Sequence, residues 1–394
     1  MTELYHRACT VESTHKRIQP AASLCGITRL LDLTQLDCIG IPTYAATRPT
    51  GKVINVSNGK GATATAAKVS ALMEGIETFH AENPNLSLIS YSSEDELRRG
   101  GLRFLSLDDY LRSPGCLSGS TEFYYSSRQT MRWTMASELW SGEEYYIPVS
   151  SVYYMEPFAH SWCSNGLASG NTYDEAVCHA LYECIERDAF SHTVNGDFNA
   201  YGRRTYLIDT ETVPSGLASV LDGFSRAGII TYLFALPCLA QLHTFCFFSV
   251  ASFEDNPLLR VNIGLGTHTS AAIAVVRAVT ECAQARLTMI HGAREDLYWP
   301  QRDHESIASD QAQLMAWLKA TRDLGQKDWS SYLTANQNLG IADTFYLQRK
   351  ALCESLADQG HTKIFCAYLK KQEIGIDVVK VLVPSLSLDR KILE

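Results

Sequence analysis

The chain has 394 residues, a formal net charge of −9 and an isoelectric point near 5.7. Its 46 % hydrophobic and 20 % charged content is typical of a globular protein with a sizeable core. The absence of a basic run argues against nucleic acid as a primary partner. No apolar run approaches the roughly 20 residues of a membrane span, and the first residues lack a signal-peptide core. We therefore expect a cytoplasmic protein that does not contact membranes.

The first third of the chain predicts two short strands, a turn and a long helix. The strands are expected at Leu36–Tyr44 and Val53–Val56, and the Asn58–Gly61 segment is expected to form a turn or loop. Apolar residues recur at helical spacing within Ala64–Ala81, which predicts a helix. The polar, mixed segment 83–130 is interpreted as a mobile insertion with short helices and turns.

The rest of the chain alternates between strand and helix patterns. Trp133–Tyr154 predicts strands joined at a Ser141–Gly142 turn, and a glycine-rich loop then leads into a helix within 165–187. Further helices are expected at Gly216–Ala227, Ala271–His291, 305–325 and 344–358, and further strands at Ile229–Ala235, Thr244–Ala251, Lys363–Ala367 and Ile376–Val383. This pattern predicts an α/β (α+β) fold.

The helix within 165–187 carries an unusual acidic face. At about 100° per residue, Glu175, His179, Glu183 and Glu186 lie within roughly 80° of one another. The opposite side is apolar and is expected to face the core. The residues on that side are Val177, Leu181, Cys184 and Ile185.

The same loop–helix pattern occurs three times. Each copy has a Thr or Ser at the helix start, an Ala four residues later, and then three polar positions on one face. The copies are Thr63, Ala67, Ser70, Glu74 and Glu77; Thr172, Ala176, His179, Glu183 and Glu186; and Ser270, Ala274, Arg277, Glu281 and Gln284. Ordinary helix design also favours Ala, Glu and a Thr or Ser cap, but three copies in register favour an internal repeat.

Several carboxylates on neighbouring helices repel one another unless their pKa values rise or a cation binds among them. With Mg²⁺, they can hold a triphosphate, while glycine loops and helix N-termini meet the phosphates. No Walker A or GxGxxG motif is present. Basic side chains are needed beside such a ligand, although each alone is also compatible with a solvated or ion-pairing role. The candidates are Lys16, Lys60, Arg187, Arg277 and Arg286.

The cysteines and histidines give no separate motif. The chain has 12 cysteines and no CxxC pair, so we interpret them as reduced, mostly buried thiols, with one catalytic cysteine as an unassigned alternative. No serine-hydrolase, HExxH or kinase signature is visible. His179 shares the acidic face, and pairing with a neighbouring glutamate is its simplest interpretation.

Three segments resemble the YcaO family: SNGKGATATAAKVSALMEGIE (57–77), SNGLASGNTYDEAVCHALYECIERDA (164–189) and GLGTHTSAAIAVVRAVTECAQAR (264–286). GITR (26–29) followed by LDCIGIP also resembles the N-terminal part of this family. The resemblance implies a single domain over 1–394, with a core at about 10–300 and closing helices and strands over 301–394. It also implies a YcaO-type fold with mixed sheets and a nucleotide site between the three acid-bearing helices.

The resemblance further implies an ATP- and Mg²⁺-dependent enzyme that O-phosphorylates a peptide backbone amide, after which a nucleophile replaces the oxygen. Carried over residue by residue, it assigns two sets of site residues and no catalytic residue. The nucleotide-binding set is Ser70, Glu74, Asn171, Glu175, Arg187, Glu281, Gln284 and Arg286, to which we add the basic candidate Lys60, and the metal-ligating set is Glu74, Glu77, Glu183 and Glu186.

Three functions remain open. Azoline-forming members tend to end in a PxPxP tail, whereas Pro384 is the single proline in the segment 381–394. We therefore expect sulfur incorporation to give a thioamide in a ribosomally made peptide or protein. An azoline-forming cyclodehydratase and a non-catalytic scaffold for a methylthiotransferase are the alternatives. The expected partners are the substrate, a TfuA-like or leader-binding protein, and a second copy of the chain.

Overall fold

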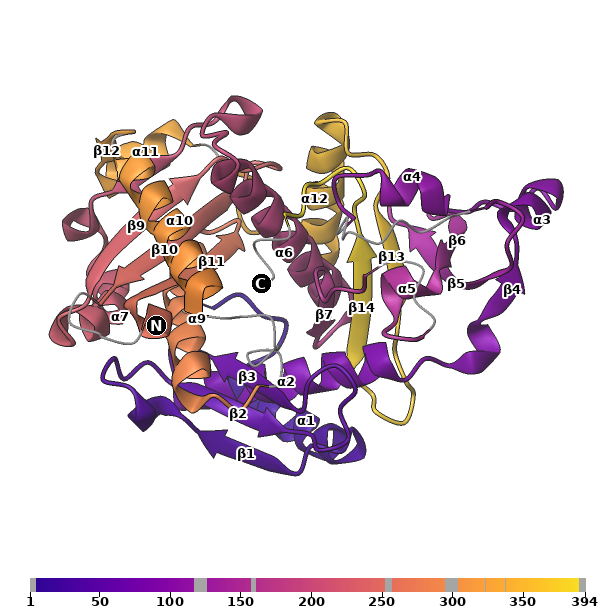
Figure 1. Cartoon of the computed structure of the whole chain (residues 1–394), viewed down its shortest axis with the longest axis horizontal. Coiled ribbons are helices and arrows are strands. Elements are labelled where there is room, and N and C mark those ends of the chain that lie inside the picture. The colour runs from indigo at the N-terminus through magenta and orange to yellow at the C-terminus, as the bar shows by residue number, and fades with distance from the viewer. Residues whose placement is uncertain are drawn as a thin grey trace. The chain divides into compact units, whose positions relative to one another are not determined.

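The computed structural model describes residues 5–116, 126–156, 161–251, 257–294, 304–322, 324–336 and 338–389 (Figure 1). The chain forms two compact units, each assembled from separate segments. Unit 1 comprises Met1–Thr50, Ile54–Gly75 and His192–Ile341, and unit 2 comprises Gly51–Val53, Ile76–Ser191 and Ala342–Glu394. Each unit combines helices with sheets, which confirms the predicted fold class.

Unit 1 begins with helix α1 (Val11–Leu24) and a small antiparallel sheet. Its strands are β1 (Arg29–Asp32), β2 (Thr43–Thr47) and β3 (Val56–Lys60), in the order β1-β2-β3. The predicted strand at Leu36–Tyr44 is wrong except at its last two residues, because η2 (Thr34–Leu36) and an irregular segment occupy most of it. The Ile41–Pro42 step explains this, since proline disfavours regular pairing there.

A five-stranded sheet forms the centre of unit 1. Its order is β11-β10-β9-β8-β12, and it is mixed because β12 pairs with β8 in parallel while the other pairs are antiparallel. The strands are β8 (Tyr206–Ile208), β9 (Ile230–Leu236), β10 (His243–Val250), β11 (Val261–His268) and β12 (Gln326–Lys327). The predictions for β9 and β10 are therefore confirmed within one or two residues.

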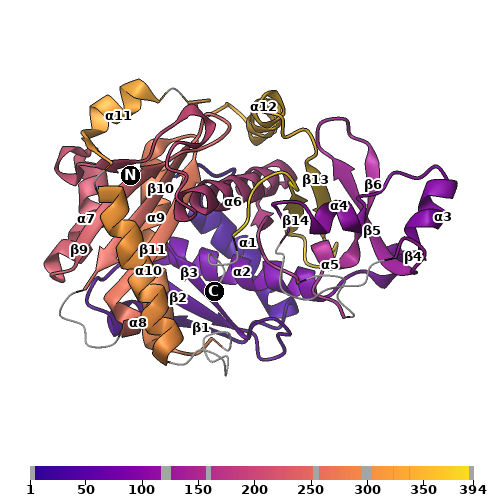
Figure 2. The same cartoon turned by 45° about the horizontal axis from the view of Figure 1, so that its top comes forward.

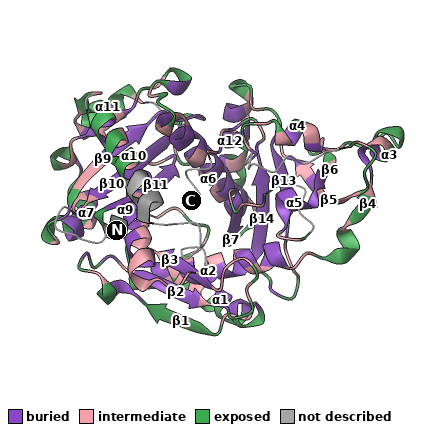
Figure 3. Ribbon diagram, in the orientation of Figure 1, coloured by how far each residue is buried: buried purple, intermediate pink, exposed green. Residues whose placement is uncertain are grey.

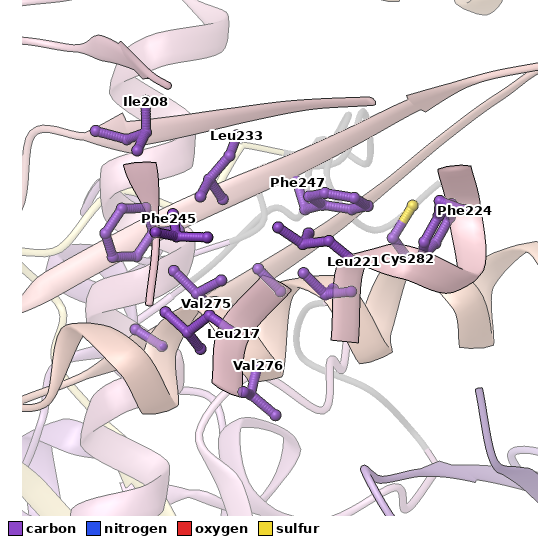
Figure 4. Packing of buried hydrophobic residues seen from close by; sticks show 14 of the residues in the cluster. Ile208, Leu217, Leu221, Phe224, Leu233, Phe245, Phe247, Val275, Val276 and Cys282 are labelled. Carbon is purple, nitrogen blue, oxygen red and sulfur yellow. The ribbon is translucent and has the colours of Figure 1, made fainter. Parts of the chain in front are cut away.

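Helices cover both faces of this sheet (Figure 2). Strand residues alternate between the faces, so Phe247 packs on Phe224 of α7 (Ser215–Arg226) with ring centroids 5.0 Å apart. Phe248 instead stacks on Trp317 of α10 (His304–Arg322) at 5.7 Å. Helix α9 (Ala271–His291) lies with α7 on the first face, as the buried cluster of Figure 4 shows.

Unit 2 contains a six-stranded antiparallel sheet. Its main path is β4-β5-β13-β14-β7, with β6 pairing on β5. The strands are β4 (Ser90–Ser92), β5 (Met131–Glu138), β6 (Glu144–Pro148), β7 (Leu167–Gly170), β13 (Phe365–Tyr368) and β14 (Asp377–Leu382). The sheet confirms the predicted β5–β6 hairpin and the two closing strands.

Helix α6 (Tyr173–Val194) is buried along most of its length (Figure 3). Helix α2 (Ala64–Glu82) confirms the prediction for that segment, and its residues belong to unit 1 up to Gly75 and to unit 2 from Ile76. The remaining helices are η3 (Leu86–Leu88), α3 (Glu94–Arg99), α4 (Leu107–Leu111), α5 (Val149–Val152), η4 (Ala200–Gly202), η5 (Thr210–Thr212), α8 (Pro257–Arg260), α11 (Trp329–Ala335) and α12 (Phe345–Asp358).

The segment 83–130 contains η3, β4, α3 and α4, so the predicted short helices are present. Capping explains two of them, because Ser93 and Ser106 accept backbone N–H groups at the starts of α3 and α4. Part of the predicted insertion, 117–125, lies outside the described residues. The mobility of the segment stays a prediction.

The predicted loop at Asn58–Gly61 is wrong, because its residues up to Lys60 lie in strand β3, and the loop expected before α6 likewise contains strand β7. Glycine is needed here for close packing. A Cβ atom at Gly59 would lie 1.9 Å from the Ala71 nitrogen of α2, and one at Gly266 would lie 2.0 Å from the Ala274 oxygen of α9. Each of these glycines therefore lies where its strand packs directly on the following helix.

The repeated alanine has the same explanation in all three copies. The alanines four and eight residues after each helix start are fully buried, and strand glycines pack against all of them except Ala180. These residues are Ala67 and Ala71, Ala176 and Ala180, and Ala274 and Ala278. The internal repeat is thus a strand followed by a helix, held at close distance by small residues on both.

All 12 cysteines are free, and most are buried, as predicted. Within the residues that the structure describes, each helix is too short or too polar to cross a bilayer.

Candidate functional site

In unit 1, Lys60 of β3 forms an ion pair with Glu281 of α9, between Lys60 Nζ and Glu281 Oε2. Both side chains are partly exposed, at 22 % and 19 %. The structure therefore brings together two predicted site residues that come from different copies of the repeat. Because both side chains are partly exposed, a ligand can still reach them. The ion pair meanwhile orients the two charged groups relative to each other.

The outer edge of β3 is occupied by polar groups of the same helix. Gln284 donates its amide Nε2–H to the backbone oxygen of Asn58, and the Asn58 Nδ2–H donates to Thr288 Oγ1 at 2.7 Å. Since β3 ends its sheet, its outer backbone groups have no strand partner. Gln284 of α9 satisfies the Asn58 carbonyl, and this contact fixes the Gln284 amide against β3.

Arg286 lies deeper than the sequence suggests. Its side chain is 4 % exposed, its Nε donates to Asp37 Oδ2 at 2.9 Å, and its Nη1 donates to the Leu259 oxygen at 2.7 Å. These contacts anchor α9 to the segment that follows η2. A nucleotide-binding role for Arg286 stays a prediction.

Two further predicted residues of unit 1, Ser70 and Glu74, lie half-buried on α2. Arg277 occupies the equivalent position on α9 and is also half-buried. The first polar position of each repeat therefore lies between core and solvent. Lys16, by contrast, is exposed on α1.

In unit 2, Glu77 of α2 is held by Ser169 of β7. The Ser169 backbone N–H donates to Glu77 Oε1 at 2.8 Å, and its hydroxyl donates to the same oxygen at 2.5 Å. This contact joins the helix of the first copy to the strand of the second. It fixes the orientation of a predicted metal ligand.

The acidic face of α6 is confirmed, but it is not a solvated surface. Glu175 and Glu186 are 2 % and 1 % exposed, whereas His179 and Glu183 are half-buried. The residues predicted on the opposite face are buried in the core. Buried carboxylates require hydrogen bonds or a cation, because burial disfavours the charged form.

Neutral and basic groups surround these carboxylates. The Asn171 backbone N–H donates to Glu175 Oε2 at 3.1 Å, and the Asn171 side chain is largely buried as well. The Arg187 guanidinium lies 3.9 Å from Glu186 Oε1. Helix α6 therefore presents carboxylates and one arginine, and Asn171 just before it adds an amide; these are the group types that bind Mg²⁺ and phosphate.

The residues present fit a magnesium–nucleotide ligand in their chemistry, since every predicted metal ligand supplies a hard carboxylate oxygen. Among the described side chains, no three His, Cys, Asp or Glu groups form a cluster ready to hold a metal ion. The individual metal and nucleotide roles, and a nucleotide position between the three helices, stay predictions.

The cysteines near these helices are protected from reaction. Burial, with the Glu183 charge as the next cause, raises the pKa of the Cys184 thiol above its usual range. Burial likewise raises the pKa of Cys282 to about 12. Since the thiolate is the nucleophile, burial disfavours the reactive form of these two cysteines.

Three residues escaped the sequence interpretation: Asn58, Asp37 and Ser169. Asn58 and Ser169 lie on strands, five and three residues before the helix starts Thr63 and Thr172, where the sequence suggests loops. Each directly precedes a glycine that packs on a helix, Gly59 or Gly170, and this was the available signal, because neighbouring strand residues face opposite sides. Asp37 carries no such pattern.

The comparison with known proteins covers nearly the whole chain. Residues 58–387 match the family model described as YcaO cyclodehydratase, ATP- and Mg²⁺-binding. A Methanothermobacter thermautotrophicus protein is 32 % identical over 98 % of this chain and 96 % of its own length. A Rhizobium leguminosarum bv. trifolii protein, called the uncharacterized protein in the tfuA 3′ region, is 29 % identical over 99 % of this chain and 90 % of its own.

Among solved structures, YcaO from Methanopyrus kandleri bound with AMPPCP and Mg²⁺ superposes with a TM-score of 0.74. It is 21 % identical in sequence, and the match covers 98 % of this chain and 93 % of that one. The fold and the family model together define an ATP- and Mg²⁺-binding enzyme that activates peptide amides. The chain belongs to the YcaO family.

Proposed function

We propose that this enzyme replaces a backbone amide oxygen of a ribosomally made peptide or protein with sulfur, giving a thioamide. The observation that carries the choice is the relative from the tfuA 3′ region, which aligns with 99 % of this chain. A TfuA-like protein is the proposed partner, and the reaction is placed in the cytoplasm.

The site residues are proposed as the family resemblance and the basic candidates assign them. In unit 1, Lys60, Ser70, Glu74, Glu281, Gln284 and Arg286 are proposed to bind the nucleotide, with Glu74 also a metal ligand. In unit 2, Asn171, Glu175 and Arg187 are proposed to bind the nucleotide, and Glu77, Glu183 and Glu186 the metal.

An amide is a difficult substrate because its carbonyl is a poor electrophile and its oxygen a poor leaving group. When bound, ATP supplies the phosphoryl group that makes the oxygen a leaving group, and Mg²⁺ neutralises charge on that phosphoryl group. The protein's own contribution is positioning. The Lys60 ammonium and the Arg187 guanidinium are suited to orient anionic oxygens, and the buried Glu186 is suited to hold a cation away from water.

The first experiment tests the nucleotide site by calorimetry with AMPPCP and Mg²⁺. Glu183→Ala and Glu186→Ala should each abolish Mg²⁺-dependent binding, whereas the exposed Glu144→Ala should leave it unchanged. Unchanged binding in both α6 variants would remove the proposed site. Thermal melts of all three variants establish that they fold.

The second experiment identifies the chemistry by mass spectrometry. The full-length protein is incubated with ATP, Mg²⁺, sulfide, a TfuA-like partner and a candidate peptide encoded beside the gene. A gain of about 16 Da marks exchange of oxygen for sulfur, because the activated amide carbon is attacked by an external nucleophile. A loss of water without sulfur gain would contradict the proposal.

An azoline-forming cyclodehydratase is the second candidate, because the matching family model carries the name cyclodehydratase. In that reaction a Cys, Ser or Thr side chain of the peptide is the nucleophile, and the peptide loses about 18 Da. A peptide variant with these side chains replaced by Ala separates the two reactions, since a thioamide forms without them. If the peptide shows neither mass change and ATP is not turned over, a scaffold role is favoured.

A further inference from the structure

Ser169 of β7 makes two hydrogen bonds to Glu77 of α2, a contact that no sequence motif predicts. Ser169 is 4 % exposed, and its backbone N–H and its hydroxyl both donate to Glu77 Oε1, at 2.8 and 2.5 Å. Two donors on one carboxylate oxygen fix both the position and the rotation of the carboxylate, and hydrogen bonds to a charged acceptor are the stronger kind.

The place of β7 in its sheet explains why this contact forms. β7 is the last strand of the six-stranded sheet, with β14 on its inner side. A buried edge strand must find partners for its outward backbone groups outside the sheet. Glu77 accepts the outward N–H of Ser169, so the carboxylate is bound to the rigid edge of a sheet and not only to its own helix.

The internal repeat provides a second example of the same arrangement. Ser169 lies three residues before the helix start Thr172, and Lys60 lies three residues before Thr63. Each of the two side chains contacts a glutamate from the helix of another copy, Glu77 for Ser169 and Glu281 for Lys60. The strand position three residues before the helix start therefore holds a glutamate in both copies.

The two examples differ in charge. The Lys60 ammonium group forms an ion pair with Glu281 and so compensates the negative charge of that carboxylate. Ser169 is neutral, so its two hydrogen bonds orient Glu77 without bringing a positive charge to it.

We propose that Ser169 is a positioning residue that holds Glu77 as a Mg²⁺ ligand. The inference rests on the proposed nucleotide–metal site. Residues that hydrogen-bond a metal-ligating group tune its orientation, and their loss typically costs about 10–100-fold in metal affinity.

The test measures Mn²⁺ and Mg²⁺ affinity directly, with AMPPCP present, by electron paramagnetic resonance of Mn²⁺ and by calorimetry with Mg²⁺. Ser169→Ala removes the hydroxyl and should raise the metal Kd by about 10-fold or more. Ser169→Thr restores a hydroxyl and should return the Kd to within about 3-fold of wild type. Ser169→Lys imitates copy one and should weaken metal binding beyond the Ala variant, by about 100-fold.

Ser249→Ala is the matched control. Ser249 is a buried strand serine that donates to the Asn262 oxygen at 3.3 Å, outside the proposed ligand set. It should leave the metal Kd unchanged, which separates loss of a hydroxyl in a core strand from loss of the contact with Glu77. Thermal melts confirm that each variant is folded.

The outcomes distinguish this inference from the proposed function. Metal affinity in Ser169→Ala within twofold of wild type, together with lost binding in Glu77→Gln, would overturn the inference and leave the proposed site intact. Wild-type protein that binds no Mg²⁺ with AMPPCP would overturn both. Equal losses in Ser169→Ala and Ser169→Thr would also overturn the role of the hydroxyl.

Discussion

Lys60 and Glu281 lie 221 positions apart in the chain, and their side chains form an ion pair in unit 1. One comes from the strand of the first repeat and the other from the helix of the third. The pair places a cation and an anion beside Gln284, whose amide is fixed on the backbone of Asn58. We therefore expect Lys60 to contribute more to ligand binding than to the stability of the protein.

We predict that Lys60→Met weakens AMPPCP binding about tenfold while changing the stability of the protein by less than about 1 kcal/mol, because a partly exposed pair stabilises the fold little. Calorimetry and urea unfolding measure the two effects. The exchanged variant Lys60→Glu with Glu281→Lys can re-form the pair and should still bind poorly. Full binding by the exchanged variant would contradict a ligand role for Lys60.

The close packing of β3 on α2 predicts a large effect from one added methyl group. Gly59→Ala should lower the free energy of unfolding by about 3 kcal/mol or more, because its Cβ would lie 1.9 Å from the Ala71 nitrogen. The control is Gly216→Ala in α7, where a Cβ meets nothing within 4 Å. Alanine there should be neutral or stabilise by up to about 1 kcal/mol, and similar urea midpoints for the two variants would contradict the packing argument.

Arg286 allows its structural and ligand roles to be separated. Breaking the buried pair from either side, by Arg286→Met or Asp37→Asn, should destabilise unit 1 by about 3 kcal/mol, because one charge remains buried without compensation. If Arg286 also binds the nucleotide, only Arg286→Met should weaken AMPPCP binding beyond the loss of folded protein. Equal binding by the two variants, corrected for folded fraction, would restrict Arg286 to a structural role.

The buried imidazole of His80 predicts acid sensitivity. Burial lowers the pKa of His80 from 6.5 to about 4, with its Nδ1 2.7 Å from the Ile76 oxygen. Between these values the unfolded chain binds a proton that the folded chain does not, so the stability contribution is complete above pH 6.5 and is lost as pH falls towards 4. The loss amounts to about 2 kcal/mol between pH 7 and pH 5.

Urea unfolding of wild type and His80→Leu at pH 7, 6 and 5 measures this effect. The variant should lose less stability than wild type over that interval, whatever its stability at pH 7. Lys371 and Glu373 also face His80 and have opposite effects on its pKa, so Lys371→Met should leave a smaller change than His80→Leu. Parallel pH curves for wild type and His80→Leu would contradict the prediction.

The strands show where prediction from sequence is limited. β9 and β10 have long apolar runs whose pattern is local, so their positions follow from the sequence. β3 and β7 contain Asn, Gly and Ser, which are typical of turns in isolation. Only their packing against α2 and α6 makes glycine favourable there, and that packing joins the strands to helix residues through backbone contact.

The amino-acid sequence by itself determined the helices, the three-fold repeat and the polar positions on each helix, because these depend on periods of three to four residues along the chain. Its motifs also identified the YcaO family. Tertiary structure alone decided which side chains meet: Lys60 with Glu281, Gln284 with the backbone of Asn58, Ser169 with Glu77, and Arg286 with Asp37. These contacts join positions that are far apart in the chain, and they form where a sheet edge or a buried charge requires a partner.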